Sequence, residues 1–342
     1  MAIDEIVGDS IDRAISIEMR FGSGLPRGVI HQLYDAARRQ AGGPLCLRAA
    51  QGLKDRVRKG DHVFVVTGAG TPPWLPRGET DGPIGAAALA RAVEIGLGAK
   101  PVLLGEERNL ASTIGCTEAA GLVVVDAETF AQRNGCAHAL PLPLGVEAGR
   151  TAADELFARF SPAAVIFVEK GGPNSKGVFH SIMGTGREPE LMANAHFLAD
   201  LAAAKGVLSI GVGDGGNEIG CGAILGAVQE IQPFGRKCQC PCGAGVATVT
   251  SCDHLVLASV SNWGGYGVAA ALAGLLERPS VLHDTDTELR MLDRCIEAGA
   301  MDGAYARLIP FVDGTTAAVQ TSLITILHQI VANGLMAYDR GF

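Results

Sequence analysis

Short apolar runs alternate with helical patterns along most of this chain, and this alternation constrains the fold more than any other feature. The runs lie at residues 62–67, 100–105, 121–126, 138–145, 163–170, 206–213 and 253–259. Most are rich in β-branched residues and end at glycine or an acid, as buried parallel strands do. The run at 138–145 is interrupted by prolines and is either an interrupted strand or an edge of the sheet. The sequence predicts an α/β fold, a mostly parallel Rossmann-like sheet flanked by helices on both faces.

The residues before the first apolar run have helical spacing of their apolar positions. Helices are predicted at Ile11–Arg20, Val29–Arg39 and Leu45–Val57. We therefore expect an N-terminal helical segment, residues 1–60, packed on the core of a catalytic α/β domain at 61–342. A single domain spanning 1–342 is the alternative.

Composition excludes several classes of partner. The net charge is −8 and no Lys/Arg cluster opposes it, so no nucleic-acid partner is expected. No charge-free apolar stretch reaches about 18 residues, and the first residues lack a signal-peptide pattern, so no membrane association is expected. The nine cysteines suit a reducing, cytoplasmic location. A homodimer is expected because symmetric dimers are the commonest oligomers.

The stretch Gly211–Gly220 contains Gly-x-Gly-x-x-Gly after an apolar run, the spacing of a dinucleotide-binding loop. No second strand ending in an acid follows, and Asp214 and Glu218 would repel a pyrophosphate. Two acids on a glycine-rich loop instead suit a divalent cation, with Asn217 as a neutral oxygen ligand, or a substrate ammonium. Alternatively, Asp214 caps the next helix and Glu218 lies in its first turn.

A second acid-rich loop, "ETDGPIGA", precedes a helix predicted to begin near Pro83. Glu79 and Asp81 could share a cation or amine site with the first loop, since both loops follow predicted strands. Asp81 is also a plausible N-cap of that helix. Nothing in the spacing decides which carboxylates take part.

A third loop, "VEKGGPNSKGVFHS", places Glu169 and Lys170 at the end of a predicted strand. Ligands of such sheets bind beyond the carboxyl ends of the strands, so both are candidate site residues, and Asn174 is a third. Lys170 would suit a carboxylate ligand. Lys176 and His180 are expected in a solvated loop.

The stretch "SNWGGYG" precedes a helix predicted at residues 268–276. The amides of Gly264 and Gly265 could hold an anionic group at that helix N-terminus. Trp263 and Tyr266 could instead close the edge of the sheet.

Cysteines alternate in "KCQCPCG", at positions 238, 240 and 242. Zinc sites commonly use Cys-x2-Cys pairs, which this spacing does not match. A surface loop of reduced thiols is the favoured interpretation, and a metal site is the alternative.

The motifs "ETDGPIGA", "GVGDGGNEIGCG" and "SNWGGYG", in this order, resemble the D-glutamate cyclase family from about Arg27 to the last helix. The resemblance implies a carbon–oxygen lyase that converts D-glutamate to 5-oxo-D-proline and water with a divalent metal, Mn²⁺ or Mg²⁺. Where the family's pattern has an arginine after the glutamate, this chain has Lys170, and "GVFHS" stands where a Tyr-Asn pair is expected. The substrate could therefore be another amino diacid, its amide or a lactam.

On this basis Glu169, Lys170, Asp214 and Glu218 are predicted to be catalytic, with Asp214 and Glu218 holding the metal. Substrate contacts are predicted for Glu79, Asp81, Gly82, Asn174, Gly215, Gly216, Asn217, Asn262, Gly264 and Gly265. An amidohydrolase that opens a small cyclic amide is one alternative function. A non-catalytic small-molecule sensor is another.

Overall fold

The structure is a computed structural model that describes residues 3–19, 25–70 and 72–336. Its centre is a seven-stranded parallel sheet in the order β3-β4-β2-β1-β5-β8-β9. These strands are β1 (His62–Thr67), β2 (Lys100–Glu106), β3 (Val123–Val124), β4 (Cys136–Leu142), β5 (Ala164–Val168), β8 (Leu208–Gly213) and β9 (His254–Leu257). Two small antiparallel hairpins add β6 (Phe179–His180) with β7 (Gly186–Arg187), and β10 (Phe311–Val312) with β11 (Thr315–Thr316).

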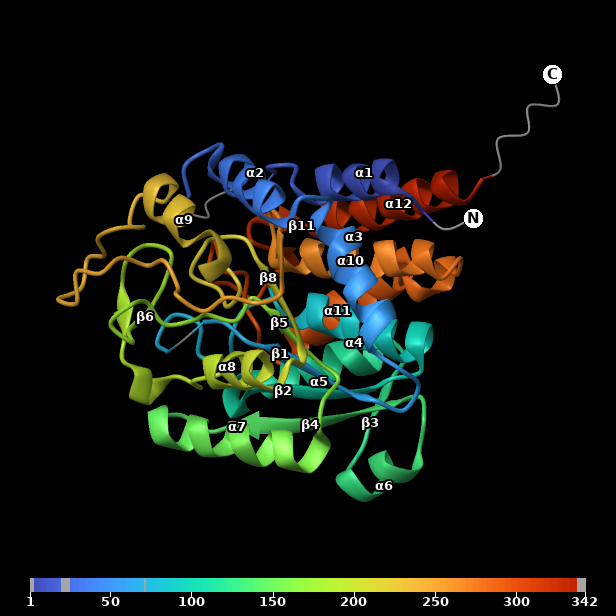
Figure 1. The fold of residues 1–342 in the computed structure, drawn as a ribbon, viewed down its shortest axis with the longest axis horizontal. Coiled ribbons are helices and arrows are strands. Elements are labelled where there is room, and N and C mark those ends of the chain that lie inside the picture. Colours follow the sequence, from blue (N-terminus) through green and yellow to red (C-terminus); the bar gives the residue numbers. More distant parts are fainter. Residues whose placement is uncertain (1–2, 20–24, 71, 337–342) are drawn as a thin grey trace.

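Helices cover both faces of the sheet, as predicted (Figure 1). The α-helices are α1 (Glu5–Ile15), α2 (Val29–Ala41), α3 (Leu45–Arg56), α4 (Pro83–Leu97), α5 (Glu107–Ala119), α6 (Ala127–Gln132), α7 (Val146–Phe160), α8 (His196–Lys205), α9 (Leu225–Ile231), α10 (Ser261–Leu275), α11 (Thr285–Glu297) and α12 (Ala317–Leu335). Short 3-10 turns lie at Pro189–Leu191, Gly222–Ile224 and Pro279–Val281.

The two-residue side-chain period of the strands divides the core into two layers. Val63 and Val65 of β1 face the larger layer with α3, α4, α5 and α10. Phe64 and Val66 face the other layer with α6, α7 and α8. This near-continuous apolar sequence is what a parallel strand buried on both faces requires.

The N-terminal helices pack into the larger core layer. α1 contacts α3, α10 and α12, and α3 also contacts α10. α1 begins at Glu5, where the Asp4 side chain accepts from two backbone N–H groups, and it ends at Ile15. The predicted helix at Ile11–Arg20 therefore started too late, and Arg20 lies outside the described residues. The domain division at residue 60 stays a prediction.

The proline-interrupted run forms β4, which is an inner strand and not an edge strand. Its neighbour β3 pairs only with Cys136 and Ala137. Pro141 lies beyond that pairing and pairs with Gly105 of β2. A missing N–H at position 141 therefore removes no hydrogen bond to β3. Within the described ranges, no helix has both the length and the apolar composition needed to cross a membrane.

Candidate active site

One cavity of about 210 Å³ lies beyond the carboxyl ends of β1, β5 and β8. Strands β2, β3 and β4 lie on one side of β1, whereas β5, β8 and β9 lie on the other side. The strand order therefore reverses between β1 and β5, and ligand binding is expected at such a point. The lining comes from the loops after these strands, the β6–β7 hairpin, the segment before β11 and one residue before α2. The lining residues are Leu25, Ala69, Gly70, Leu75, Glu79, Glu169, Ser181, Ile182, Met183, Arg187, Asp214, Asn217, Glu218, Gly303, Ala304 and Asp313.

The described lining of this cavity is strongly acidic. It holds five carboxylates, from Glu79, Glu169, Asp214, Glu218 and Asp313, and one guanidinium, from Arg187. Burial raises the pKa of Glu79 to about 8, and the nearby Asp313 carboxylate adds to the shift. Burial also raises the pKa of Glu169 well above its usual range, with Asp214 and Glu218 adding to it. Crowded carboxylates with raised pKa values favour binding of a cation.

The carboxylates form two overlapping groups that fit a divalent cation. Donor oxygens of Glu169, Asp214 and Glu218 all lie within 4.8 Å of one another, and those of Asp81, Asp214 and Asp313 do as well. Asp214 belongs to both groups. Carboxylate oxygens are the ligands that Mg²⁺ and Mn²⁺ prefer.

Asn217 adds a neutral oxygen to this wall of the cavity. Its Oδ1 atom is buried and accepts no hydrogen bond from the described residues, whereas its Nδ2 donates to the His180 carbonyl at 3.1 Å. A buried amide oxygen needs a donor or a cation. The residues present therefore fit both a divalent cation and a substrate ammonium.

The glycine loop after β8 folds back on its own glutamate. The amides of Gly215 and Gly216 donate to the Glu218 carboxylate at 3.2 and 2.8 Å, respectively. The two amides therefore orient Glu218, and the substrate contact predicted for them is replaced by this role. The next helix, α9, begins only at Leu225, after a 3-10 turn. Asp214 does not cap it, and Glu218 does not lie in its first turn.

Asp81 and Asn262 cap each other's helices. Asp81 lies just before α4 and caps α10, whereas Asn262 lies in the first turn of α10 and caps α4. The Asp81 carboxylate accepts from Ser261 N at 2.9 Å and Asn262 N at 2.7 Å, the first amides of α10. Asn262 Oδ1 in turn accepts from Gly82 N at 2.8 Å and Gly85 N at 2.7 Å, at the start of α4. The predicted capping role of Asp81 is correct in kind, but it serves α10 and not α4. Neither Asn262 nor Gly82 lines the cavity.

Gly82 lets the acidic loop approach the end of β5. Its φ is +104°, and a Cβ there would lie 2.7 Å from Thr67 Oγ1 and 3.1 Å from Glu169 Cβ. Glu169 itself has a φ of +48°, a left-handed conformation that is uncommon for glutamate. Its Oε2 accepts from the Ser261 hydroxyl at 2.5 Å. This strained backbone at a cavity-lining acid is typical of functional sites.

Lys170 lies away from the cavity, contrary to the predicted contact with substrate. Its ammonium donates to Glu106 Oε2 at 2.5 Å and to the Gly68 carbonyl at 3.2 Å, and both charged side chains are almost fully buried. Glu169 lines the cavity, whereas the next side chain, that of Lys170, is directed to Glu106 and Gly68. Among the described lining residues, the cation is Arg187, from β7.

Asn174 also lies outside the cavity lining, because it organises its own loop. Its Nδ2 donates to the Gly245 carbonyl at 2.8 Å, and its Oδ1 accepts from Lys176 N and Val178 N. Lys176 is exposed, as predicted, whereas His180 is buried.

The stretch "SNWGGYG" lies inside a helix and not before one, because α10 begins at Ser261. Gly264 and Gly265 permit close packing: a Cβ on Gly264 would lie 2.5 Å from Val212 Cγ1, and one on Gly265 would lie 3.0 Å from the Gly85 carbonyl oxygen. Gly264 N already donates to the Val260 carbonyl. The predicted anion-binding role of these glycines is therefore replaced by helix packing of α10 against α4 and β8.

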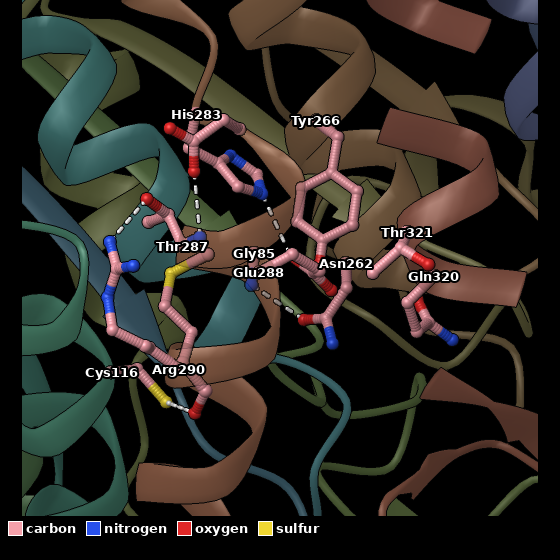
Figure 2. A network of polar contacts seen from close by, with 12 residues as sticks. Gly85, Cys116, Asn262, Tyr266, His283, Thr287, Glu288, Arg290, Gln320 and Thr321 are labelled. Atoms are coloured by element: carbon pink, nitrogen blue, oxygen red, sulfur yellow. Dashed lines mark hydrogen bonds and ion pairs between the residues drawn. The ribbon is translucent and has the colours of Figure 1, made fainter. Parts of the chain in front are cut away.

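The two aromatic residues of this stretch point into the core and do not close a sheet edge. Trp263 Nε1 donates to Gln320 Oε1 at 2.7 Å, and Tyr266 OH donates to Glu288 Oε1 at 2.8 Å. His283 Nε2 lies 2.8 Å from the other oxygen of Glu288. Figure 2 shows Tyr266 and His283 converging on Glu288 beside Asn262, which is a network between helices and not a ligand surface.

The sequence reasoning missed two charged residues of the cavity. Asp313 and Gly314 form the turn between β10 and β11, with φ values of +48° and +74°. An Asp-Gly pair between apolar or β-branched residues is a known hairpin signal, which could have located Asp313. Asp302 supports this turn by accepting from Gly314 N at 2.8 Å. Arg187 lies in "GTGREPE" and carries no comparable signal.

Comparison with known proteins agrees with these observations. The family described as "D-glutamate cyclase-like, C-terminal" matches residues 25–328. A human protein named "D-glutamate cyclase, mitochondrial" is 46% identical over 74 residues, which cover 21% of this chain and only 11% of the human protein. The match to the family spans most of the chain, including every carboxylate of the cavity. The chain therefore belongs to the D-glutamate cyclase-like family.

Proposed function

We propose that the protein closes an amino diacid, D-glutamate or a close analogue, to a lactam with loss of water, assisted by a divalent cation. The observation that carries this proposal is the cavity whose described lining holds five carboxylates and one guanidinium. Membership of the family and the partial identity to an enzyme named D-glutamate cyclase support it.

The charges of the cavity complement those of an amino diacid. The carboxylates suit a cation and the substrate ammonium, and Arg187 suits the α-carboxylate, for which a guanidinium offers a two-pronged contact. The volume of about 210 Å³ lies below the roughly 300–1,000 Å³ of pockets that take drug-sized ligands, which favours a small metabolite.

Glu169, Asp214 and Glu218 would hold the cation, with Asn217 Oδ1 as a neutral fourth ligand. When bound, the cation supplies Lewis acidity toward the γ-carboxylate, which is otherwise a poor electrophile. Gly215 and Gly216 hold Glu218 in place through their amides. Ser261 fixes Glu169 in the same way through its hydroxyl.

Glu79 is the residue that we assign to proton transfer. Ring closure forms a bond from the amine nitrogen to the γ-carboxyl carbon and breaks one carbon–oxygen bond, so two ammonium protons leave with the departing oxygen as water. A carboxyl group with a pKa of about 8 can take a proton from the ammonium and return it to that oxygen near neutral pH. Because both reacting groups belong to one molecule, binding in a bent conformation supplies much of the acceleration.

The test is a substrate panel followed by NMR in the presence of Mg²⁺. We expect D-glutamate to disappear and 5-oxo-D-proline to form, and Asp214→Asn to abolish this turnover. Hydrolysis of a lactam without any cyclisation would favour an amidohydrolase. No turnover of any panel member, with ligand binding retained in Asp214→Asn, would favour a sensor and contradict the proposal.

A further inference from the structure

Two loops that are far apart in the sequence bring three thiols and one imidazole together. Cys238 Sγ lies 3.4 Å from Cys240 Sγ and 3.3 Å from Cys242 Sγ. His180 Nε2 lies 3.3 Å from Cys240 Sγ and 3.5 Å from Cys242 Sγ. The cysteines come from the segment between α9 and β9, whereas His180 belongs to β6. Their four donor atoms all lie within 4.8 Å of one another.

This arrangement has the dimensions of a tetrahedral metal site. With Zn–S bonds of about 2.3 Å and a Zn–N bond of about 2.0–2.1 Å, tetrahedral geometry places sulfurs about 3.8 Å apart and nitrogen about 3.6 Å from sulfur. The nitrogen–sulfur separations of 3.3 and 3.5 Å lie close to this value, and the sulfur–sulfur separations of 3.3 and 3.4 Å are shorter by about half an ångström, so a small outward shift of the thiols would admit the ion. The Cys-x-Cys-x-Cys spacing does not match the usual Cys-x2-Cys pairs, and it gives no sign of the fourth donor, His180, which comes from β6.

The imidazole is oriented as a metal ligand would be. His180 Nδ1 lies 3.1 Å from the Val178 carbonyl, so the ring donates there and its Nε2 lone pair faces the sulfurs. Asn174 Nδ2 donates to Cys242 Sγ at 3.4 Å, a contact that favours a thiolate. Position 186 has no room for a side chain, because a Cβ on Gly186 would lie 2.8 Å from Cys240 Sγ.

The cysteines lie in the less constrained part of a long segment without regular structure. Residues 232–253 form no helix or strand, and loops of more than about 12–15 residues without regular structure are uncommon in compact domains. Residues 246–253 are held by several hydrogen bonds, such as Thr248 N to the Gly216 carbonyl and Val249 N to the Pro173 carbonyl. The cysteine-bearing part, residues 236–243, makes fewer, such as Gln239 N to the Gly184 carbonyl of the β6–β7 hairpin and Lys176 Nζ to the Cys242 carbonyl. A metal cross-link would restrict it much further.

We propose that His180, Cys238, Cys240 and Cys242 bind a structural Zn²⁺ that fastens residues 232–253 to the β6–β7 hairpin. Thiolates and imidazole are the ligands that zinc prefers, whereas the acidic cavity offers only oxygen ligands to a harder cation. The chain thus has two metal sites of different chemistry. No open coordination position is left at the zinc site, which is typical of a structural role.

The zinc site would also hold one wall of the acidic cavity. Ser181, Ile182 and Met183 follow His180 directly, and Arg187 lies in the paired strand β7. The His180 carbonyl accepts from Asn217 Nδ2. Loss of zinc should therefore loosen Arg187 and Asn217, which would raise KM for a carboxylate substrate more than it lowers kcat.

The experiment measures metal content and coordination in the intact protein, purified and reconstituted with Zn²⁺ under reducing, oxygen-free conditions. Mass spectrometry of the metal should find about one Zn²⁺ per chain that survives dialysis with excess Mg²⁺. Replacement by Co²⁺ should give the thiolate-to-metal absorption and intense visible bands of a tetrahedral sulfur site. This measurement on the unaltered chain does not depend on any variant folding.

The variants then assign the ligands. Cys240→Ser should bind zinc at least tenfold more weakly than the unaltered protein. Cys252→Ser, in the same segment but outside the cluster, should bind zinc as the unaltered protein does. Asp214→Asn should also keep its zinc, which separates this site from the cavity. Any of three results would overturn the proposal: no thiolate-bound metal in the reduced protein, a native disulfide between Cys238 and Cys242, or unchanged zinc in Cys240→Ser.

Discussion

The acidic cavity should make the stability of the cation-free protein fall as pH rises, and Glu79→Gln should remove part of that effect. The Glu79 carboxyl has a pKa of about 8 in the folded chain, against an ordinary value of 4.5. The folded state therefore keeps a proton that the unfolded chain releases between these two values. The free energy of unfolding must then fall with increasing pH across this window.

The magnitude follows from the difference between the two pKa values. At about 1.4 kcal/mol for each unit of this difference, Glu79 contributes a loss of roughly 5 kcal/mol as pH rises from well below 4.5 to well above 8. Glu79 faces a cavity that admits solvent, so this figure is an upper bound. A glutamine of nearly the same shape does not titrate and should remove this share of the pH dependence.

The assay is urea unfolding with EDTA at about pH 5.5 and about pH 8, repeated with Mn²⁺. The unaltered protein should lose stability between these conditions, Glu79→Gln should lose clearly less, and Glu155→Gln, exposed on α7, should behave like the unaltered protein. Mn²⁺ should stabilise more at the higher pH, because its ligands must be deprotonated. Equal pH dependence in the unaltered protein and Glu79→Gln would refute the reasoning.

Three further predictions concern packing and stability, each measured by urea unfolding. Lys170→Met should lower the free energy of unfolding by about 3–5 kcal/mol, because it leaves Glu106 buried without its partner. Adding Glu106→Leu should restore part of this loss. If the losses of the two single variants simply add in the double variant, the ion pair is contradicted. Asn262→Ala should cost about 1–3 kcal/mol because two buried amides of the α4 N-terminus lose their acceptor, and a loss near zero would argue against the cap. Gly85→Ala should cost about 1–3 kcal/mol, since its Cβ would lie 2.7 Å from Asn262 Cα, whereas Gly226→Ala, which meets open space, should be neutral or stabilising.

The sequence predicts the sheet well because parallel strands buried on both faces leave a strong signal. β1, β5 and β8 each coincide with an apolar run that is followed by glycine or an acid, and the predicted bounds agree with the strands within two residues. Helix starts were harder to predict, because α10 begins with a Ser-Asn-Trp-Gly-Gly sequence that looks like a loop. Its first amides are satisfied by Asp81, far away in the chain, and no local pattern reveals such a cap.

Part of the candidate site was predictable for a similar reason. Glu169 and Asp214 lie directly after strands and Glu218 in the loop after β8, where the fold places ligands, and all three line the cavity. Lys170 was misplaced because its direction depends on the buried Glu106, which is distant in sequence. The grouping of His180 with three cysteines likewise depends on how two loops meet, which their separate spacings do not encode.

The most direct test of the central claim is turnover of D-glutamate as a function of Mn²⁺ concentration, followed by chiral chromatography of 5-oxo-proline. The unaltered protein should form 5-oxo-D-proline in proportion to its bound Mn²⁺ and none in EDTA. Asp214→Asn, which removes the carboxylate common to both donor groups, should bind Mn²⁺ weakly and form no product. Undiminished turnover in EDTA, or turnover by Asp214→Asn equal to that of the unaltered protein, would contradict the account.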